Sequence, residues 1–274
     1  MGVSSADEFF RCLGLTDKPF GMYYADEEPA VSIAPKPCVL PSVEDEAAGR
    51  VDWRSIHLSF ACVLGMMWRA RKKNCAAVFD RERFGCLGGA FYLGFLKPQL
   101  DMVARYVSTG IPNQMEGERY LRSAEVARHF FETVDPRPAP ARYCIFKPIG
   151  QFLEGERPEL IVFFGRPECV AGLHQLATFV TDDFEVVRSP FGSGCSTIVT
   201  WPLYYIAQGK PLAVIGCWDP SDRKFLRPDE ITFTVPASLF DLMLNRWRDS
   251  FLTTSTWLVV RQRVDRSKRV WGEA

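Results

Sequence analysis

Short apolar runs of strand length alternate along this chain with longer runs of helical periodicity, and this alternation limits the folds that it can adopt. "RYCIFKPI" and "ELIVFFG" are rich in β-branched and aromatic residues and are bounded by Pro and Gly. "RPECVAGLHQLATFV" and "ASLFDLMLNRWRDSFL" place apolar residues at helical spacing. The pattern predicts an α/β or α+β fold, in which helices pack on a layered mixed sheet.

The same patterns place the individual elements along the chain. The expected helices cover residues 5–14, 53–74, 86–95, 114–134, 166–180, 195–208 and 237–252. The expected strands cover residues 18–25, 75–80, 142–149, 159–165, 184–190, 211–217 and 230–236.

Charge and hydropathy restrict the class of protein. The 33 basic residues balance the 33 acidic ones, which argues against a nucleic-acid partner because such proteins normally carry a basic surplus. The longest apolar run, residues 58–68, is far shorter than the roughly 20 residues that a membrane span needs. The first residues show no secretory signal pattern. We therefore expect a cytoplasmic protein that uses neither nucleic acid nor membrane.

The chain contains nine cysteines but only three histidines. An odd number of cysteines in a reducing compartment makes a disulfide framework improbable and leaves metal binding or reactive thiols as the alternatives. No C-x-x-C pair, which marks zinc ribbons and many iron–sulfur proteins, is present.

Two cysteine-bounded segments of similar length share one sequence pattern, and we name them the echoed segments. One runs from Cys62 to Cys86 and the other from Cys195 to Cys217. Each starts with a cysteine, passes through helix-like residues and a polar break, and reaches an "AV" strand that is followed by a Gly-Cys pair. If the two segments belong to pseudo-symmetric halves, the four cysteines meet where the halves join.

Three functions are compatible with this pattern. Four thiolates suit an iron–sulfur cluster or, as second choice, zinc, with a redox or sensing role and a redox partner. Alternatively, the "GSGC" turn before a helix lowers the pKa of Cys195 and makes it the nucleophile of a metal-free small-molecule enzyme, with His174 as the nearest base in sequence. In the third interpretation the cysteines only pack in the core of a ligand-binding module. Whether the chain is an enzyme stays open.

Glycines and a basic turn suggest where a cofactor or ligand would lie. Gly88 and Gly89, within "CLGGAFYLG", allow close backbone approach to another element or a cofactor. Arg223, within "SDRKF", is placed to hold a carboxylate or phosphate of a small anionic ligand. A solvated turn is an equal explanation for Arg223.

Several blocks of the sequence resemble a family of uncharacterised archaeal and bacterial proteins, domain-of-unknown-function family 169, also labelled ArCR. The similarity is carried by "FACVLGMMWRAR", "CLGGAFYLG", "GCSTIVTWP" and "VIGCW" with "SDRKF", in this order along the chain. The resemblance implies that Cys62, Cys86, Cys195 and Cys217 belong to recurring motifs, which favours a shared site. It also implies a single domain over residues 1–274, of which residues 250–274 form an extension beyond the family core. The turn "DPSDR" is longer than the family pattern, which puts the role of Arg223 in doubt.

Overall fold

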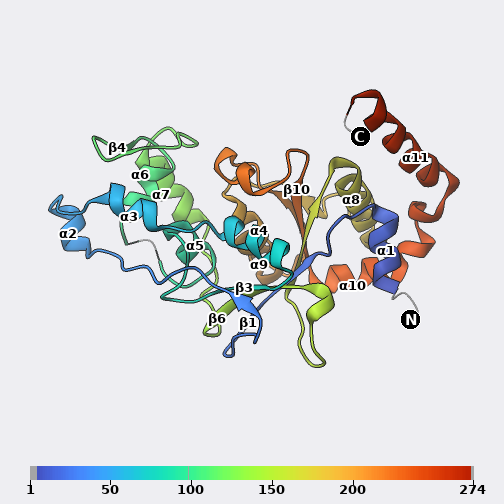
Figure 1. The fold of residues 1–274 in the computed structure, drawn as a ribbon, viewed down its shortest axis with the longest axis horizontal. Helices are drawn as coiled ribbons and strands as arrows, with labels where there is room; N and C mark the ends of the chain where they lie inside the picture. The colour runs from blue at the N-terminus through green and yellow to red at the C-terminus, as the bar shows by residue number, and fades with distance from the viewer. Residues whose placement is uncertain (1–4, 98, 273–274) are drawn as a thin grey trace.

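The computed structural model describes residues 5–97 and 99–272, whose strands form one large mixed sheet and a small hairpin (Figure 1). The strands of the large sheet are β1 (Phe20–Ala25), β2 (Ser32–Ile33), β3 (Ala76–Phe79), β6 (Tyr143–Pro148), β7 (Leu160–Gly165), β8 (Val187–Arg188), β9 (Ala213–Gly216) and β10 (Ile231–Pro236). The hairpin pairs β4 (Gly110–Ile111) with β5 (Met115–Glu116). This arrangement confirms the predicted α/β class with a mixed sheet.

The large sheet is built from two halves with the same internal plan. Within the described residues its order is β2-β3-β6-β1-β7-β10-β9-β8. The first half contributes β1, β2, β3 and β6, and the second half contributes β7, β8, β9 and β10. In each half the second and third strands are parallel and the remaining pairs are antiparallel. The predicted pseudo-symmetric halves are therefore present in both strand order and strand direction.

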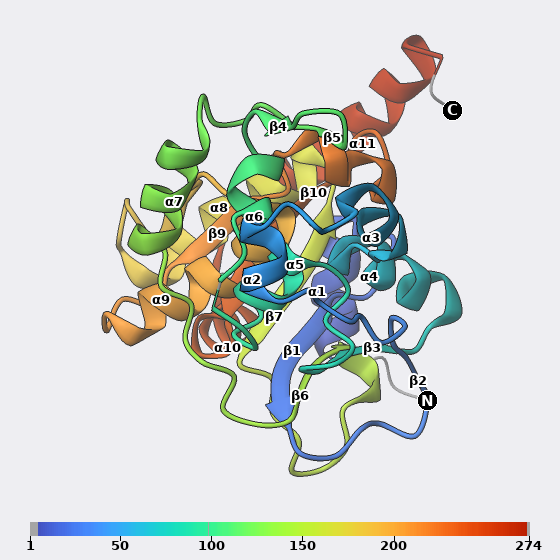
Figure 2. The same ribbon diagram turned by 90° about the vertical axis from the view of Figure 1, so that its left-hand side faces the viewer.

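The halves join through antiparallel pairing of β1 with β7 (Figure 2). Phe20 pairs with Val162, Gly21 with Ile161, and Met22 with Leu160.

The helices are α1 (Ser5–Leu13), α2 (Val43–Ala47), α3 (Trp53–Ser59), α4 (Val63–Lys73), α5 (Leu87–Tyr92), α6 (Met102–Tyr106), α7 (Ala124–Thr133), α8 (Pro167–Thr181), α9 (Trp201–Ala207), α10 (Ala237–Arg246) and α11 (Ser255–Val270). Short 3₁₀ or π turns lie at η1 (Ile149–Gln151), η2 (Ser196–Thr200), η3 (Pro220–Phe225), η4 (Trp247–Asp249) and η5 (Phe251–Thr253). No helix among the described residues combines the length and apolar character that crossing a membrane requires.

The expected helix at 237–252 ends as α10 at Arg246 and is followed by the turns η4 and η5. Two further expected helices are divided or begin later in the structure. The expected helix at 53–74 is divided into α3 and α4, because Phe60 and Cys62 both have extended backbone. The expected helix at 114–134 begins only at Ala124, where the Ser123 hydroxyl accepts a hydrogen bond from the Val126 amide at 3.2 Å. Strand β5 and a turn occupy the residues before it. In both cases periodicity identified the helix but not the point at which it begins.

Each face of the sheet packs against its own group of helices. Strand β7 alternates between the two faces and is buried on both, which explains its uninterrupted apolar sequence. Leu160, Val162 and Phe164 belong to one core with residues of α4, α5, α6 and α7, which we name the site-side core. Ile161 and Phe163 belong to the far core, with residues of α1, α8 and α10.

A buried ion pair also connects the two halves. The Arg71 guanidinium, on α4, forms two hydrogen bonds with the Glu230 carboxylate, at 2.9 and 3.1 Å, just before β10. The Glu230 side chain is 1% exposed and that of Arg71 is 9% exposed. Asp17 also binds the same guanidinium. Removing one partner would leave a buried charge without adequate compensation.

We predict that Glu230→Ala lowers the free energy of unfolding by about 3 kcal/mol, because Arg71 then loses the more buried of its carboxylate partners and keeps Asp17. Urea denaturation measures the effect. Glu116→Ala is the matched control, since Glu116 forms an exposed ion pair with Arg119, and it should change stability by about 0.5 kcal/mol or less. Equal effects of the two substitutions would contradict the interpretation.

Candidate functional site

A cavity of about 630 Å³ lies on the site-side core and takes its walls from both halves of the chain. First-half residues between 57 and 131 form one side, and residues 189–195 and 218–225 of the second half form the other. Aromatic side chains dominate the walls: Phe60, Tyr92, Tyr106, Tyr120, Phe130, Phe131, Phe191, Trp218 and Phe225. Concave, largely apolar sites with a few polar groups are typical of small-molecule binding.

Cys62 reaches the cavity from the break between α3 and α4. Its extended backbone starts α4, and the Ala61 amide donates to the Gly85 carbonyl at 2.8 Å, which holds the break in place. The Cys62 thiol donates a hydrogen bond to Oδ1 of Asp222 at 3.0 Å. A first-half thiol is thereby connected to a second-half carboxyl group.

Cys86 lines the cavity at the start of α5. Its sulfur accepts a hydrogen bond from the Gly89 amide at 3.3 Å, so it caps the helix. A Cβ at Gly89 would lie 2.5 Å from the Phe84 carbonyl oxygen, which explains why this position is glycine. Gly88 lines the cavity, and a Cβ there would meet nothing closer than 3.9 Å.

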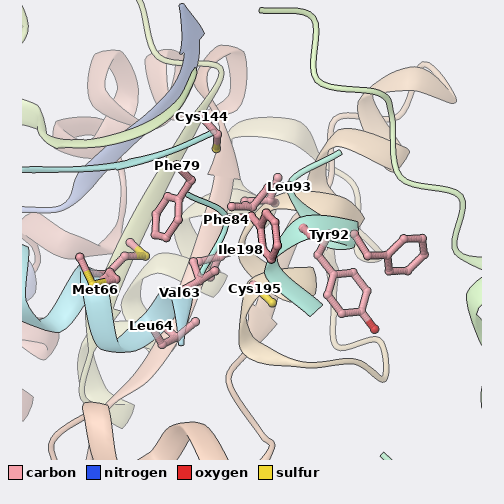
Figure 3. Close-up of a cluster of buried hydrophobic side chains, with 14 of the residues drawn as sticks. Val63, Leu64, Met66, Phe79, Phe84, Tyr92, Leu93, Cys144, Cys195 and Ile198 are labelled. Carbon is pink, nitrogen blue, oxygen red and sulfur yellow. The ribbon is translucent and has the colours of Figure 1, made fainter. Parts of the chain in front are cut away.

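Cys195 precedes the π-helical turn η2, which continues directly into α9. Its sulfur lies 3.1 Å from the Ser193 hydroxyl. In Figure 3 its side chain lies in the site-side core near Val63, Leu64 and Ile198. The turn is tied to the first half because the Thr200 hydroxyl donates to the Tyr92 carbonyl at 2.9 Å. Single π-helical turns are frequent at functional sites.

Cys217 lies behind the cavity wall rather than in it. It follows β9 with a left-handed backbone, φ 61°, and its side chain is fully buried. Its amide donates to the Thr197 hydroxyl at 3.2 Å. Gly194 separates it from the carboxyl of Asp222, since a Cβ at Gly194 would lie 3.0 Å from the Cys217 sulfur and 2.4 Å from Oδ2 of Asp222.

Of the four cysteines of the two echoed segments, Cys62 bonds to Asp222 and Cys217 lies close to it, while Cys86 and Cys195 line the same cavity. Burial, followed by the nearby Asp222 carboxyl, raises the pKa values of Cys62 and Cys217. Burial raises the pKa of Cys86 to about 11, and burial with the neighbouring Cys86 raises that of Cys195. All four are thus protonated thiols at neutral pH. Among the described residues, no three His, Cys, Asp or Glu side chains are grouped as an ion would require.

A pair of carboxyl groups, Asp219 and Asp222, lies at the same end of the cavity, and we name it the carboxyl pair. Asp222 is buried, and its Oδ2 accepts from the Gly194 amide at 3.1 Å. Asp219 precedes η3, and its Oδ2 accepts from the Ser221 hydroxyl at 3.4 Å. Its Oδ1 is buried and has no hydrogen-bond donor.

The two carboxyl groups affect each other's ionisation. Burial, together with the charge of Asp222, raises the pKa of Asp219 to about 8, and burial raises the pKa of Asp222. Adjacent carboxyls with little solvent cannot both ionise readily, so they hold a shared proton at neutral pH.

Sequence reasoning missed the carboxyl pair and interpreted "DPSDR" only as a lengthened turn. The available signal was two acidic residues three positions apart, directly after a strand expected to be buried.

Other polar groups of the cavity are set by their neighbours. The Tyr120 hydroxyl accepts a hydrogen bond from the Ser221 amide at 3.1 Å, and the Trp218 ring nitrogen donates to the Ser189 hydroxyl at 2.8 Å. Burial raises the pKa of Glu118 and lowers that of His57. The cavity therefore contains rings held in place by hydrogen bonds.

Arg223 does not face this cavity. Its guanidinium donates to the backbone carbonyls of Glu230, Arg227 and Pro228, at 2.5, 3.2 and 2.9 Å. The geometry therefore does not support the expected anion clamp at Arg223 in this cavity, because Arg223 is outside its lining and three of its N–H groups bond within the turn. His174, the suggested base for Cys195, lies on α8, which packs against the far core.

Comparison with known proteins identifies a family but no characterised relative. The family model described as DUF169, uncharacterised ArCR, matches residues 9–246. No curated protein and no solved structure matches the chain. Helix α11 lies beyond the matched residues and packs on the domain through the buried Trp257.

We predict that Asp219→Asn removes a pH-dependent loss of stability. The pKa of Asp219 is about 8 in the folded chain against an ordinary 3.8, so folding retains a proton between these values. The stability contributed by this group is complete below about pH 4 and is lost as the pH rises through about 8. The stability of the variant relative to wild type should therefore rise by roughly 4 kcal/mol between about pH 4.5 and about pH 8.5.

Urea unfolding across this pH range measures the difference. Asp135→Asn, at an exposed carboxylate on the surface, is the control and should show no such trend. A difference between the Asp219→Asn variant and wild type that does not vary with pH would contradict the burial of this carboxyl.

Proposed function

The chain belongs to the DUF169 family of uncharacterised ArCR proteins, and we propose that it binds a small organic molecule in the cavity between its two halves. The proposal assigns the carboxyl pair, Asp219 and Asp222, as the polar groups that contact this molecule. The single observation that supports it most is the carboxyl pair at the end of an aromatic cavity, with one buried oxygen of Asp219 lacking a donor. Among the described residues, Oδ1 of Asp219 and Nδ1 of His57 are the buried side-chain atoms without a partner that belong to residues lining this cavity.

The carboxyl pair also suggests a type of chemistry. A pair that holds one proton contains both an acid and a base, so it can give a proton to a bound molecule and accept one from it. The thiol of Cys62 donates to Asp222, which favours the ionised form of that carboxyl and leaves Asp219 as the protonated partner. Proton transfer at a small substrate is the reaction class that we assign.

A cysteine-ligated metal centre is the second candidate function. We keep an iron–sulfur cluster as first choice and zinc as second, with a redox or sensing role, at Cys62, Cys86, Cys195 and Cys217. Its support is that Cys62, Cys86 and Cys195 line one cavity and Cys217 lies behind its wall, although the four are not grouped as an ion requires and would have to move together. Binding would require the thiols to lose their protons and Cys62 to release Asp222.

A metal-free enzyme with Cys195 as nucleophile has less support. A thiolate is the reactive form, and burial of Cys195 near Cys86 raises its pKa.

We also propose a cytoplasmic location, which is supported by the free thiols of the described cysteines.

We predict that Gly88→Leu blocks the cavity without unfolding the chain. There is open space around this position, and leucine favours a helix more than glycine does. Neutral one-ring fragments such as benzyl alcohol should bind wild type with a Kd of about 1–10 mM and should lose about tenfold or more in affinity to the variant. Ligand-observed NMR measures both.

Gln175→Leu, on the exposed face of α8, is the matched control and should bind the fragment like wild type. Unchanged binding to a folded Gly88→Leu variant would show that the fragment binds elsewhere and would remove the support for the proposal.

For the second candidate, we predict that protein purified without oxygen carries iron and sulfide in stoichiometric amounts and shows the brown colour and visible absorption of a cluster. Cys62→Ser should lose the metal, whereas Cys169→Ser, at a buried cysteine of α8, should keep it. Colourless protein with stoichiometric zinc would favour the zinc alternative. Protein free of both metals after anaerobic reconstitution would exclude the centre.

A further inference from the structure

The charge of the cavity walls restricts what can occupy the cavity. The carboxyl groups among the described lining residues are Glu118, Asp219 and Asp222. The basic groups in the same lining are His57 and Lys224. Lys224 is exposed at the edge, with its ammonium 5.1 Å from the centre of the Phe225 ring. The interior end of the cavity therefore carries acidic groups without a buried cation beside them.

The carboxyl pair needs a positive partner. The two oxygens of Asp222 already accept from Cys62 and the Gly194 amide. Oδ1 of Asp219 has no donor, and its neighbour is another carboxyl group. A proton satisfies this arrangement in the empty cavity, and a ligand cation can take its place. A neutral apolar ligand would instead leave the buried oxygen unpaired, at a cost in affinity.

The aromatic walls suit an organic cation rather than a hydrated metal ion. Ring faces attract ammonium groups through their quadrupole, most strongly when the site is screened from water. Trp218 is held by its hydrogen bond to Ser189, and Tyr120 by the hydrogen bond that it accepts from the Ser221 amide in the turn that carries the carboxyl pair. Tyr106 packs on His57 with ring centres 4.9 Å apart, which fixes a further wall. Rigid aromatic walls around an acidic end are a common solution for ammonium recognition.

We propose that the ligand of this cavity is an organic cation, an ammonium compound whose charge lies beside Asp219 and Asp222 and whose apolar part lies against the aromatic walls. The inference rests on the proposed function, because it names the class of molecule that the same cavity binds. It excludes small carboxylates and phosphates as the main ligands, since the cavity's own carboxyl groups would repel them.

Three probes that share one ring but differ in charge test this inference: benzylamine, benzyl alcohol and benzoate. Isothermal titration at neutral pH should give a Kd for benzylamine about tenfold or more below that for benzyl alcohol, with benzoate the weakest. Asp219→Asn should remove most of the preference for benzylamine, measured as the ratio of the benzyl alcohol Kd to the benzylamine Kd. Asp229→Asn, at an exposed carboxylate that pairs with Arg166 outside the cavity, is the matched control and should leave all three affinities unchanged.

The outcomes separate this inference from the proposed function. If benzyl alcohol or benzoate binds as tightly as benzylamine, and Gly88→Leu blocks that binding, the cavity is a ligand site but not one for cations. If benzylamine is preferred but Asp219→Asn does not change the preference, the assigned charge contact is wrong. If none of the three probes binds wild type below about 10 mM, the inference and the proposed function both fail.

Discussion

The pairing of β1 with β7 is the constraint on which the rest of this structure depends. It joins two halves of equal plan across a short antiparallel register between Phe20–Met22 and Leu160–Val162. A shift of the join by one residue would turn Phe20 and Met22 of β1 out of the site-side core. In β7 it would exchange the side chains of the site-side core with Ile161 and Phe163 of the far core. The join brings the breaks at Cys62 and Cys86 together with the turns at Cys195 and Cys217. The cavity is therefore a property of the whole sheet, and the Arg71–Glu230 ion pair reinforces it.

The carboxyl pair shows how a costly arrangement is kept in a folded protein. Two acidic side chains in contact with little solvent oppose folding at the pH where they would ionise. Donors from both halves compensate in part, since the Cys62 thiol and the Gly194 amide both bind Asp222. Asp219 receives less, and one of its oxygens has no donor. Natural proteins retain local conflicts of this kind mainly where function requires them.

Much of the fold was accessible from the sequence, because strand-length and helix-length runs differ in period and the echoed cysteine segments revealed the two halves. The breaks were harder to predict. The apolar residues of 53–74 keep helical spacing through Phe60, but the helix is interrupted there. The Ala61 amide bonds to the Gly85 carbonyl, 24 positions away, instead of to a carbonyl of its own helix. The carboxyl pair escaped notice for a similar reason, since burial of a turn depends on the elements that cover it. The contacts of Arg223 with three carbonyls likewise follow from the local path of the turn, which composition does not reveal.

The division of the cavity walls between the halves has a consequence for cooperativity. A molecule that touches Tyr106 on one side and Trp218 on the other bridges the two halves, which also contact each other through the site-side core, the β1–β7 pairing and buried polar contacts. By mass action, its binding free energy adds to the stability of the assembled sheet, and not to the stability of either half alone. Ligand binding would then stabilise the β1–β7 join between the two similar halves, so that ligand binding and folding are thermodynamically linked.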